Sequence, residues 1–340
     1  MIKKRLLKQI SFLFLLTPFL LLTGCLPGGD EGNKSDSVTL TFAFELPNDH
    51  PWGKGAEEFK EIVENETDEE VKIDIQGGGS MGDSGSEIQE GSSVGSIDIG
   101  ISSTPLSEIN PYAEIFSLPY IFETREEAWD VLDGTIGEEV GERLEENDLK
   151  HLAWWEDGFR QVTNNVRAIE SPEDFDKLKI RVPESDVRID TFKELGASPL
   201  SMSFSEVFTG MEQGSIDGQE NPLSVVESSS YYDVQEYLTI TDHVYTPASL
   251  FINMDKWESL TDEQQEIVLK AAEEGRDVNR ELNAEKDDEL VDSLKEEGME
   301  VNTIEDPEPF QEKTKPVWDE LADELGEEAE DIIDKIQDSK

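Results

Sequence analysis

From Val38 onward, apolar and polar side chains alternate with the period of two that is typical of a β-strand. Further on, apolar residues recur at the spacing of a helix, at Ala56, Phe59 and Val63. The same change of period repeats over the first half of the chain. It predicts strands at 38–44, 71–75, 97–101 and 149–155, separated by helices at 52–64, 87–94, 125–132 and 136–146. This succession indicates an α/β domain with a largely parallel sheet.

A second succession of strands and helices begins near residue 159. In Ser171, Pro172 and Asp174 it contains the pattern of a helix start, with a cap, a proline in the first turn and an acid three residues on. Residues 217–222 are rich in turn-forming types and are predicted to form a turn. Strands are predicted at 159–163, 179–182, 237–240 and 250–253, and helices that end at glycines at 188–195 and 205–213. The repetition indicates two α/β domains.

A long helical pattern follows the second domain. Thr261 and Gln264 form a capping box, and apolar residues continue at helical spacing to about residue 297. At 1.5 Å per residue this helix would extend about 54 Å, which is longer than one domain. We therefore expect it to lie across both domains. Residues 307–336 are predicted to be helical and acidic.

The chain carries a large excess of acid: 80 Asp and Glu residues against 28 Lys and Arg give 340 residues a net charge of −52. Such a field repels phosphates and anionic membrane surfaces, so we expect no nucleic-acid partner. Six Trp, 15 Phe and 36% apolar residues argue against a disordered chain. The acids are spread over the whole sequence, as on proteins from halophiles; an acidic protein of an ordinary organism is the alternative.

The N-terminus has the pattern of an export signal. Four basic residues precede an apolar stretch at 10–22, which is too short to span a bilayer comfortably. The sequence Leu22-Thr23-Gly24-Cys25 then resembles a bacterial lipobox, and Cys25 is the only cysteine. We predict a signal peptide at 1–24, lipidation of Cys25, and a flexible tether at 25–37 that holds an extracytoplasmic protein at the membrane. A free cysteine that occurs here by chance is the alternative, and a single cysteine excludes a disulfide within the chain.

A glycine- and serine-rich stretch at 77–85 matches several catalytic motifs. It contains G-x-S-x-G around Ser80, together with matches to G-x-G-x-x-G and to G-D-S-G. A serine nucleophile needs a downstream histidine, and neither His151 nor His243 lies in a recognisable triad context. We therefore expect a loop and no enzyme, with a secreted serine hydrolase that uses Ser80 as the alternative. No metal-binding loop or histidine cluster occurs, so neither a metal nor a cofactor is expected.

Three polar residues stand out against the acidic composition. Arginine is rare, with nine in the chain, yet Arg160 follows a Gly-Phe pair and Arg181 lies inside an apolar strand. Asn221 lies in the turn-rich segment. An arginine offers a planar fork of donors that matches a carboxylate, and a recessed pair would form a positive well. The alternative is that each arginine is paired with one of the many acids.

These residues belong to an ordered set of short motifs. The set, together with His50-Pro51-Trp52-Gly53-Lys54-Gly55 before it, resembles the extracytoplasmic solute receptors of TRAP transporters (the DctP-type family) over roughly residues 38–305. Phe208 replaces a usual tyrosine, and Met81 a usual leucine. The motifs are Ser117-Leu118-Pro119-Tyr120-Ile121-Phe122, Gly158-Phe159-Arg160, Ser171-Pro172-Glu173-Asp174, Lys179-Ile180-Arg181-Val182, Leu195-Gly196-Ala197-Ser198-Pro199, Phe204-Ser205-Glu206-Val207-Phe208 and Asp217 to Pro222.

The resemblance implies a two-domain clamshell of the periplasmic-binding-protein type. One domain would comprise 38–158 and about 247–286, and the other 159–246 and about 287–340. The cleft would bind a carboxylate-bearing solute, such as a C4-dicarboxylate, a sialic-acid-like acid or a uronate sugar acid. The receptor would pass the solute to a small and a large membrane subunit that are driven by an ion gradient. A zwitterion such as ectoine is an alternative ligand, and a sensor or structural lipoprotein without membrane subunits is an alternative role.

The resemblance also implies which residues line the cleft. Arg181 would be the principal carboxylate clamp, assisted by Arg160 and Asn221. Phe204 would pack on the body of the ligand, and Glu45 would take its hydroxyl or amine groups. Ser102 and Asp83 also lie near positions that line the cleft in relatives.

Overall fold

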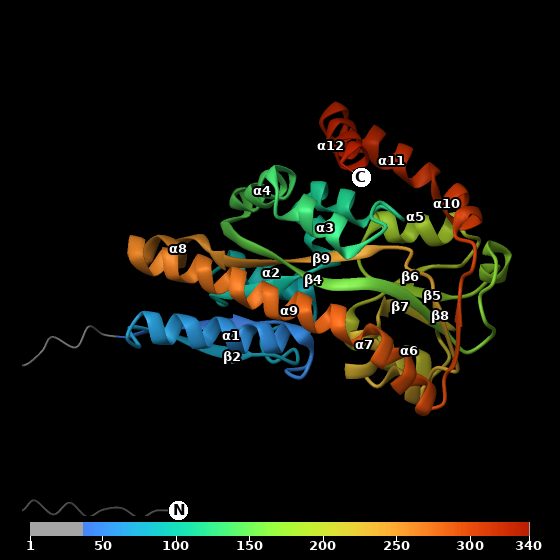
Figure 1. The fold of residues 1–340 in the computed structure, drawn as a ribbon, viewed down its shortest axis with the longest axis horizontal. Helices are drawn as coiled ribbons and strands as arrows, with labels where there is room; N and C mark the ends of the chain where they lie inside the picture. Colours follow the sequence, from blue (N-terminus) through green and yellow to red (C-terminus); the bar gives the residue numbers. More distant parts are fainter. Residues whose placement is uncertain (1–36, 340) are drawn as a thin grey trace, which may run out of the picture. The chain divides into compact units, whose positions relative to one another are not determined.

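The computed structural model describes residues 37–339, and Figure 1 shows their fold. The predicted signal peptide, Cys25 and all of the predicted tether except Ser37 lie outside the described residues. Within residues 37–339, no helix combines the length and apolar character needed to span a bilayer.

The first sheet has the strand order β2-β1-β3-β9-β4. β1 pairs in parallel with β2 and β3, as the alternation of strands and helices predicts, but β9 runs antiparallel to both β3 and β4. The prediction of a largely parallel sheet is therefore wrong at the centre, because β9 enters from the second half of the chain. The elements are β1 (Val38–Ala43), α1 (Pro51–Glu66), β2 (Val71–Gln76), α2 (Gly85–Ser93), β3 (Ile99–Ser102), α3 (Arg125–Leu132), α4 (Thr135–Glu142) and β9 (Tyr245–Asn253).

β4 (Leu149–Asn164) is one strand of 16 residues, where the sequence predicts two. The polar residues Glu156 and Asp157 and the following Gly158 interrupt the apolar pattern and suggest a loop. In the structure they stay in the strand at a register shift, where Gly158 has a φ of 117° that favours glycine. β4 pairs with β9 along its first part and with β7 and β8 at its end, so it belongs to both sheets.

The second sheet is built around the end of β4. β7 (Gly218–Pro222) runs antiparallel to β4, and every residue of it is buried. The prediction of a turn at 217–222 is therefore wrong, because buried partners satisfy polar side chains that are otherwise typical of a turn. The other elements of this part are β5 (Ile180–Val182), α5 (Asp186–Glu194), β6 (Leu200–Ser201), α6 (Val207–Glu212), α7 (Leu223–Ser228), β8 (Tyr237–Ile240) and β10 (Glu300–Thr303).

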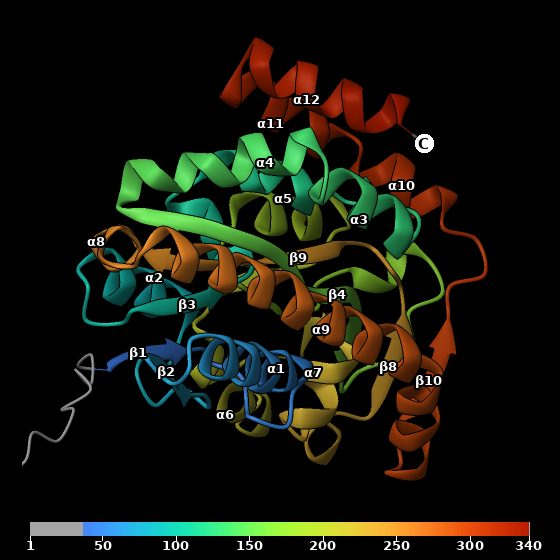
Figure 2. The ribbon, with the colours of Figure 1, turned by 60° about the vertical axis from the view of Figure 1, so that its left-hand side comes forward.

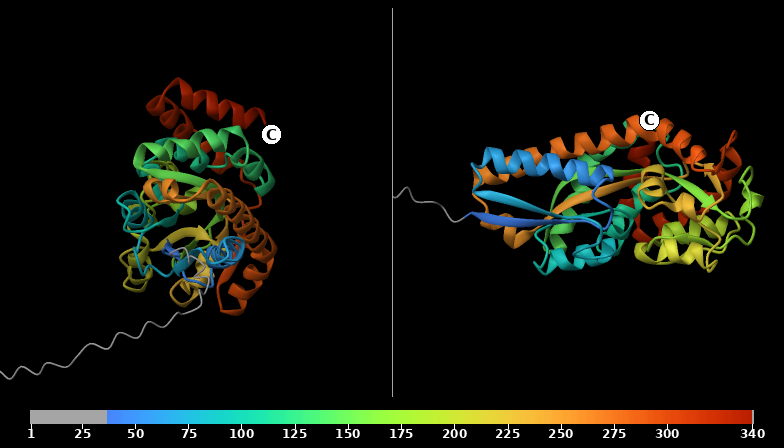
Figure 3. Two further views of the ribbon diagram at one scale, coloured as in Figure 1. Left: turned by 90° about the vertical axis from the view of Figure 1, so that its left-hand side faces the viewer. Right: turned by 90° about the horizontal axis from the view of Figure 1, so that it is seen from below.

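The long helix is confirmed as α9 (Asp262–Glu296), and both hydrogen bonds of the Thr261–Gln264 capping box are present. It packs against α1 and β4 of the first sheet and reaches α7 and β10 beyond it. Figures 2 and 3 show it running beside α1 and continuing past α7. The helix before it is α8 (Met254–Ser259), and the predicted helical tail is confirmed as α10 (Glu308–Thr314), α11 (Pro316–Leu325) and α12 (Glu327–Asp338).

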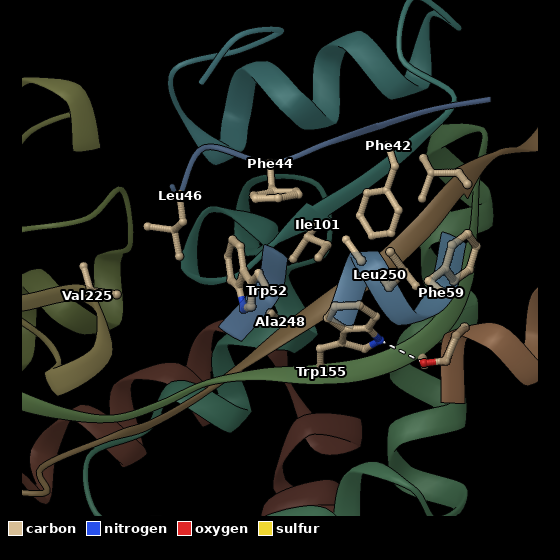
Figure 4. Packing of buried hydrophobic residues seen from close by; sticks show 14 of the residues in the cluster. Phe42, Phe44, Leu46, Trp52, Phe59, Ile101, Trp155, Val225, Ala248 and Leu250 are labelled. Atoms are coloured by element: carbon tan, nitrogen blue, oxygen red, sulfur yellow. Dashed lines mark hydrogen bonds between the residues drawn. The ribbon is translucent and has the colours of Figure 1, made fainter. Parts of the chain in front are cut away.

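The largest hydrophobic cluster lies between the first sheet and the helices α1 and α9. Trp155 is fully buried in it, and its indole N–H donates to the carbonyl of Ala272 at 3.0 Å. Figure 4 shows Trp155 with Phe42, Phe59 and Leu250 around it. Three elements join the two lobes: β4, β9 and α9. This arrangement is the two-domain clamshell that the sequence predicts. The two predicted boundaries near residues 158 and 246 fall within β4 and β9, and they stay a prediction.

Candidate ligand-binding site

A small polar cavity lies where residues of the two sheets meet. About 30 Å³ of it is open to a water-sized molecule. Of the residues predicted to bind the solute, five line it: Glu45, Arg160, Arg181, Phe204 and Asn221. Its walls come partly from β4, β5 and β7 and partly from the segments that follow β1, β3 and β5. Such segments at the ends of strands are where ligands bind in open α/β sheets.

Arg181 projects into this cavity from β5. Its neighbours Ile180 and Val182 are fully buried on the other face of the strand, because side chains alternate along it. Arg181 is 2% exposed, and the Nε and Nη2 of its guanidinium donate to the carbonyl of Met202 at 2.9 and 2.6 Å. Burial lowers the pKa of Arg181, but a guanidinium stays charged. Across residues 37–339, no carboxylate lies within ion-pair distance of it.

Arg160, by contrast, is surrounded by acceptors. Its Nε and Nη2 pair with the carboxylate of Glu220, and its Nη1 donates to Asp157 Oδ2 at 3.2 Å. Its Nη2 also donates to Asn221 Oδ1 at 2.7 Å. The alternative that an arginine is paired with acidic side chains therefore holds for Arg160 and does not hold for Arg181. The network fixes the amide of Asn221, whose Nδ2 donates to Gln219 Oε1 at 2.5 Å.

The carboxylate of Glu220 is the anchor of this network. Burial alone would raise its pKa, but the guanidinium groups of Arg160 and Arg188 and a hydrogen bond from His243 lower the pKa of Glu220 far below its usual range. Arg188 is fully buried on α5 and donates from Nη2 to Thr246 Oγ1 at 2.8 Å. Its desolvation lowers the pKa of Arg188 to about 10. Glu220 is thus a permanent negative charge behind the cavity.

Two acids at the cavity keep an oxygen without a partner. Glu45 Oε2 is shielded from solvent and accepts no hydrogen bond, and burial raises the pKa of Glu45 to about 8. Asp157 is 4% exposed, and its Oδ1 likewise accepts no hydrogen bond although Oδ2 pairs with Arg160. Burial raises the pKa of Asp157 to about 6. The sequence analysis missed Asp157, although its place in front of a glycine in an apolar strand was a usable signal.

Ser102 and Asp83 do not reach the cavity. The Ser102 hydroxyl is buried on β3 and accepts from Gln89 Nε2 at 2.6 Å, while Asp83 is exposed. Their immediate neighbours Ser103 and Ser84 line the cavity instead. The two predicted residues therefore lie next to lining residues. Ser103 follows the end of β3, and Ser84 is the N-cap of α2, so in both places one residue changes the direction of the side chain. Also unpredicted among the lining residues are Trp52, Gly85, Thr104, Glu184 and Val225.

Ser80 lies apart from the histidines that a hydrolase would need. Its exposed hydroxyl donates to Gln76 Oε1 at 3.2 Å. The His151 ring is bonded to Ser249 Oγ at 2.8 Å, and His243 is bonded to Thr241 and Glu220. The Ser80 hydroxyl therefore lacks the hydrogen bond to a histidine that a serine nucleophile needs.

Two lobes that share long strands and meet over a polar cavity define a solute-binding protein of the clamshell class. The family model described as "Bacterial extracellular solute-binding protein, family 7" (DctP) matches residues 42–325, and the chain belongs to this family of TRAP solute-binding proteins. The resemblance read from the sequence is thereby confirmed. Proteins of this family are extracytoplasmic binding proteins and not enzymes.

Relatives of known name span nearly the whole chain. The 2,3-diketo-L-gulonate-binding periplasmic protein YiaO of Escherichia coli is 33% identical over 298 residues, which cover 87% of each chain. The sugar acid binding protein DctPAm of Advenella mimigardefordensis, solved with galactonate, has a TM-score of 0.86 at 31% identity and covers 90% of this chain and 99% of its own. A TRAP receptor of Chromohalobacter salexigens, solved with D-glucuronate, has a TM-score of 0.85 at 30% identity, with coverage of 89% and 100%.

Proposed function

We propose that this protein captures an organic acid in the cleft and delivers it to the small and large membrane subunits of a TRAP transporter. The observation that carries the proposal is Arg181, a buried cation at the cavity that forms no ion pair with any carboxylate of the described residues. A buried charge is costly unless it is paired, and a ligand carboxylate is the partner that a guanidinium fork matches.

The relatives support an acid as the solute. YiaO is named for 2,3-diketo-L-gulonate, and the two solved relatives hold galactonate and D-glucuronate. The solutes proposed here are a uronate or related sugar acid, a sialic-acid-like acid or a C4-dicarboxylate. A zwitterion such as ectoine is the alternative that keeps the same carboxylate contact.

Closure of the lobes is the proposed capture step. A pocket for a small organic molecule usually holds about 300–1,000 Å³, so a solute enters this cleft only when the lobes separate. Closure on the solute then expels water and strengthens the contact between Arg181 and the carboxylate. Asn221, oriented by Arg160, adds a neutral hydrogen bond beside it. We also propose that lipidated Cys25 holds the receptor at the outer side of the membrane.

Substitution of Arg181 tests the proposal. In thermal-shift titrations at high salt with D-glucuronate, galactonate and succinate, we expect Arg181→Ala to lose the ligand-induced shift of any acid that the wild type binds. Two charged hydrogen bonds are worth about 1.5–3 kcal/mol each, so affinity should fall at least about 100-fold. The ligand-free melting temperature should move little, because the loss of the hydrogen bonds to the Met202 carbonyl is offset by removal of a buried, unpaired charge.

Arg167→Ala is the matched control, because Arg167 lies outside the cavity and donates to the carbonyl of Asp174. It should leave the ligand-induced shift intact. A full shift in Arg181→Ala would show that the carboxylate binds elsewhere.

A further inference from the structure

We infer that Asp157, together with Glu45, makes the receptor select monocarboxylates that carry hydrogen-bond donors at their other end, and reject dicarboxylates. This inference rests on the proposed function, since it assumes that Arg181 holds the first carboxylate. It assigns a specificity-determining role to Asp157 and narrows the class of solute.

The first argument is the unpartnered oxygen of Asp157. Its Oδ2 already pairs with Arg160, so the structural demand on this side chain is met by one oxygen. Its Oδ1 is shielded from solvent and accepts no hydrogen bond, although the side chain lines the cavity. A buried acceptor without a donor costs about 1–3 kcal/mol. A donor on a bound solute removes this cost, and a second carboxylate cannot.

The second argument is the charge around Asp157. Arg160 is shared between Asp157 and Glu220, and Arg188 acts on the same two carboxylates, so neither cation is left over for a carboxylate of the solute. Glu184 also lines the cavity, and it is one of the charged groups that act on Glu45. We call the part of the cavity that is lined by Asp157, Glu45 and Glu184 its acidic end. A second carboxylate of the solute placed beside the ionised Asp157 would meet like charge, which costs several kcal/mol.

The third argument is Glu45, which follows β1 and brings a second unpartnered oxygen to the cavity. Charged neighbours that act on it are Asp157, Arg181 and Glu184, and no ion pair joins it to any of the described residues. When its carboxyl group is ionised it accepts hydrogen bonds only, and when protonated it donates one and accepts others. A hydroxyl group matches both states, an ammonium group matches the ionised state, and a carboxylate matches only the protonated state, so the rejection of dicarboxylates rests on Asp157. Hydroxyl-rich acids and zwitterions thus share the chemistry that this end requires.

Calorimetric titration of the full chain at high salt tests the inference with galactonate, ectoine and succinate as probes. We expect the wild type to bind galactonate or ectoine at least 100-fold more tightly than succinate. Asp157→Asn keeps the shape and can turn an amide N–H toward the cavity while its oxygen faces Arg160. It should lower that ratio at least tenfold, by weakening the donor-rich solute and improving succinate.

Asp98→Asn is the matched control, because Asp98 is also buried but accepts from Thr41 and pairs with Lys256 away from the cavity. It should leave the ratio unchanged. Glu45→Gln is a second variant at the acidic end, for use if Asp157→Asn fails to fold. It should change the ratio in the same direction.

The inference is overturned if wild-type protein binds succinate as tightly as the donor-rich solutes, or if both cavity variants keep the wild-type ratio. Those results leave the proposed function standing, provided that Arg181→Ala still abolishes binding of the acid. If galactonate binds Arg181→Ala as well as it binds the wild type, the proposed function itself fails.

Discussion

Alanine at Gly55 should destabilise the protein, although alanine is the better helix former. Gly55 lies in α1 where it crosses α9, opposite Gly275, with the ring of Trp155 between the helices and the sheet. A Cβ at Gly55 would lie 2.5 Å from Trp155 Cζ3 and 2.6 Å from the carbonyl oxygen of Gly275. Real Cβ atoms do not approach so closely, so α1, α9 or the indole must move.

The change in stability caused by Gly55→Ala is the balance of two opposing effects. Replacing glycine by alanine within a helix gains about 1 kcal/mol. Overpacking a filled core costs about 1–3 kcal/mol and occasionally more. Here neither obstacle yields easily, because one is backbone and the indole is held by its hydrogen bond to Ala272. We expect a net loss of about 1–2 kcal/mol and a melting temperature lowered by roughly 3–6 °C.

Melting followed by tryptophan fluorescence at high salt measures the effect. Gly210→Ala in α6 is the matched control, because its Cβ would meet only the flexible ends of Ile216 at 3.2 Å and Met202 at 3.4 Å. It should be neutral or slightly stabilising. Combining Gly55→Ala with Trp155→Phe should cost less than the sum of the two single changes. If Gly55→Ala and Gly210→Ala raised the melting temperature equally, the argument that α1 and α9 pack too closely for a Cβ at Gly55 would be refuted.

Two further predictions concern stability. Burial raises the pKa of Glu114 to about 7 from 4.5, so its contribution is fully present below pH 4.5 and is lost as the pH rises through 7. The unfolding free energy of the wild type should therefore fall between pH 5 and 8 by an amount on the order of 3 kcal/mol more than that of Glu114→Gln. The same pH profile in both proteins would contradict the raised pKa. Thr261→Ala removes the capping box of α9 and should cost about 1 kcal/mol in denaturant unfolding, whereas the exposed Thr209→Ala in α6 should cost less.

Local signals predicted the helices and the outer strands well, because each carries its own period and caps. The Thr261 capping box and the apolar spacing of α9 are contained within one segment, so no partner is needed to recognise them. β4 and β7 were misread because their polar residues form a buried network with one another. Glu220 and Asn221 look like turn residues until Arg160 is placed beside them from 60 residues away.

The same reasoning applies to the site. Arg181 stands out locally as a charge in an apolar strand, and the ordered motifs predicted Arg160, Asn221, Phe204 and Glu45, which line one cavity with it. Ser102 and Asp83 lie one position before lining residues, because the direction of a single side chain depends on the local backbone, which motif similarity does not fix. The sequence could have drawn attention to Asp157, but its unpartnered oxygen becomes visible only when all neighbouring donors have been placed.

The continuity of β4 limits how the two lobes can move. From Leu149 to Asn164 the strand always has a hydrogen-bonded neighbour, first β9 and then β7. A hydrogen-bonded ladder can twist and bend, but its strands cannot slide past one another without breaking it. Closure of the lobes as proposed would therefore bring Arg181 and Glu45 back to the same separation each time. The length of a solute would then be a criterion of selection, because a solute that is too long would prevent closure and one that is too short would leave one of the two side chains without a contact.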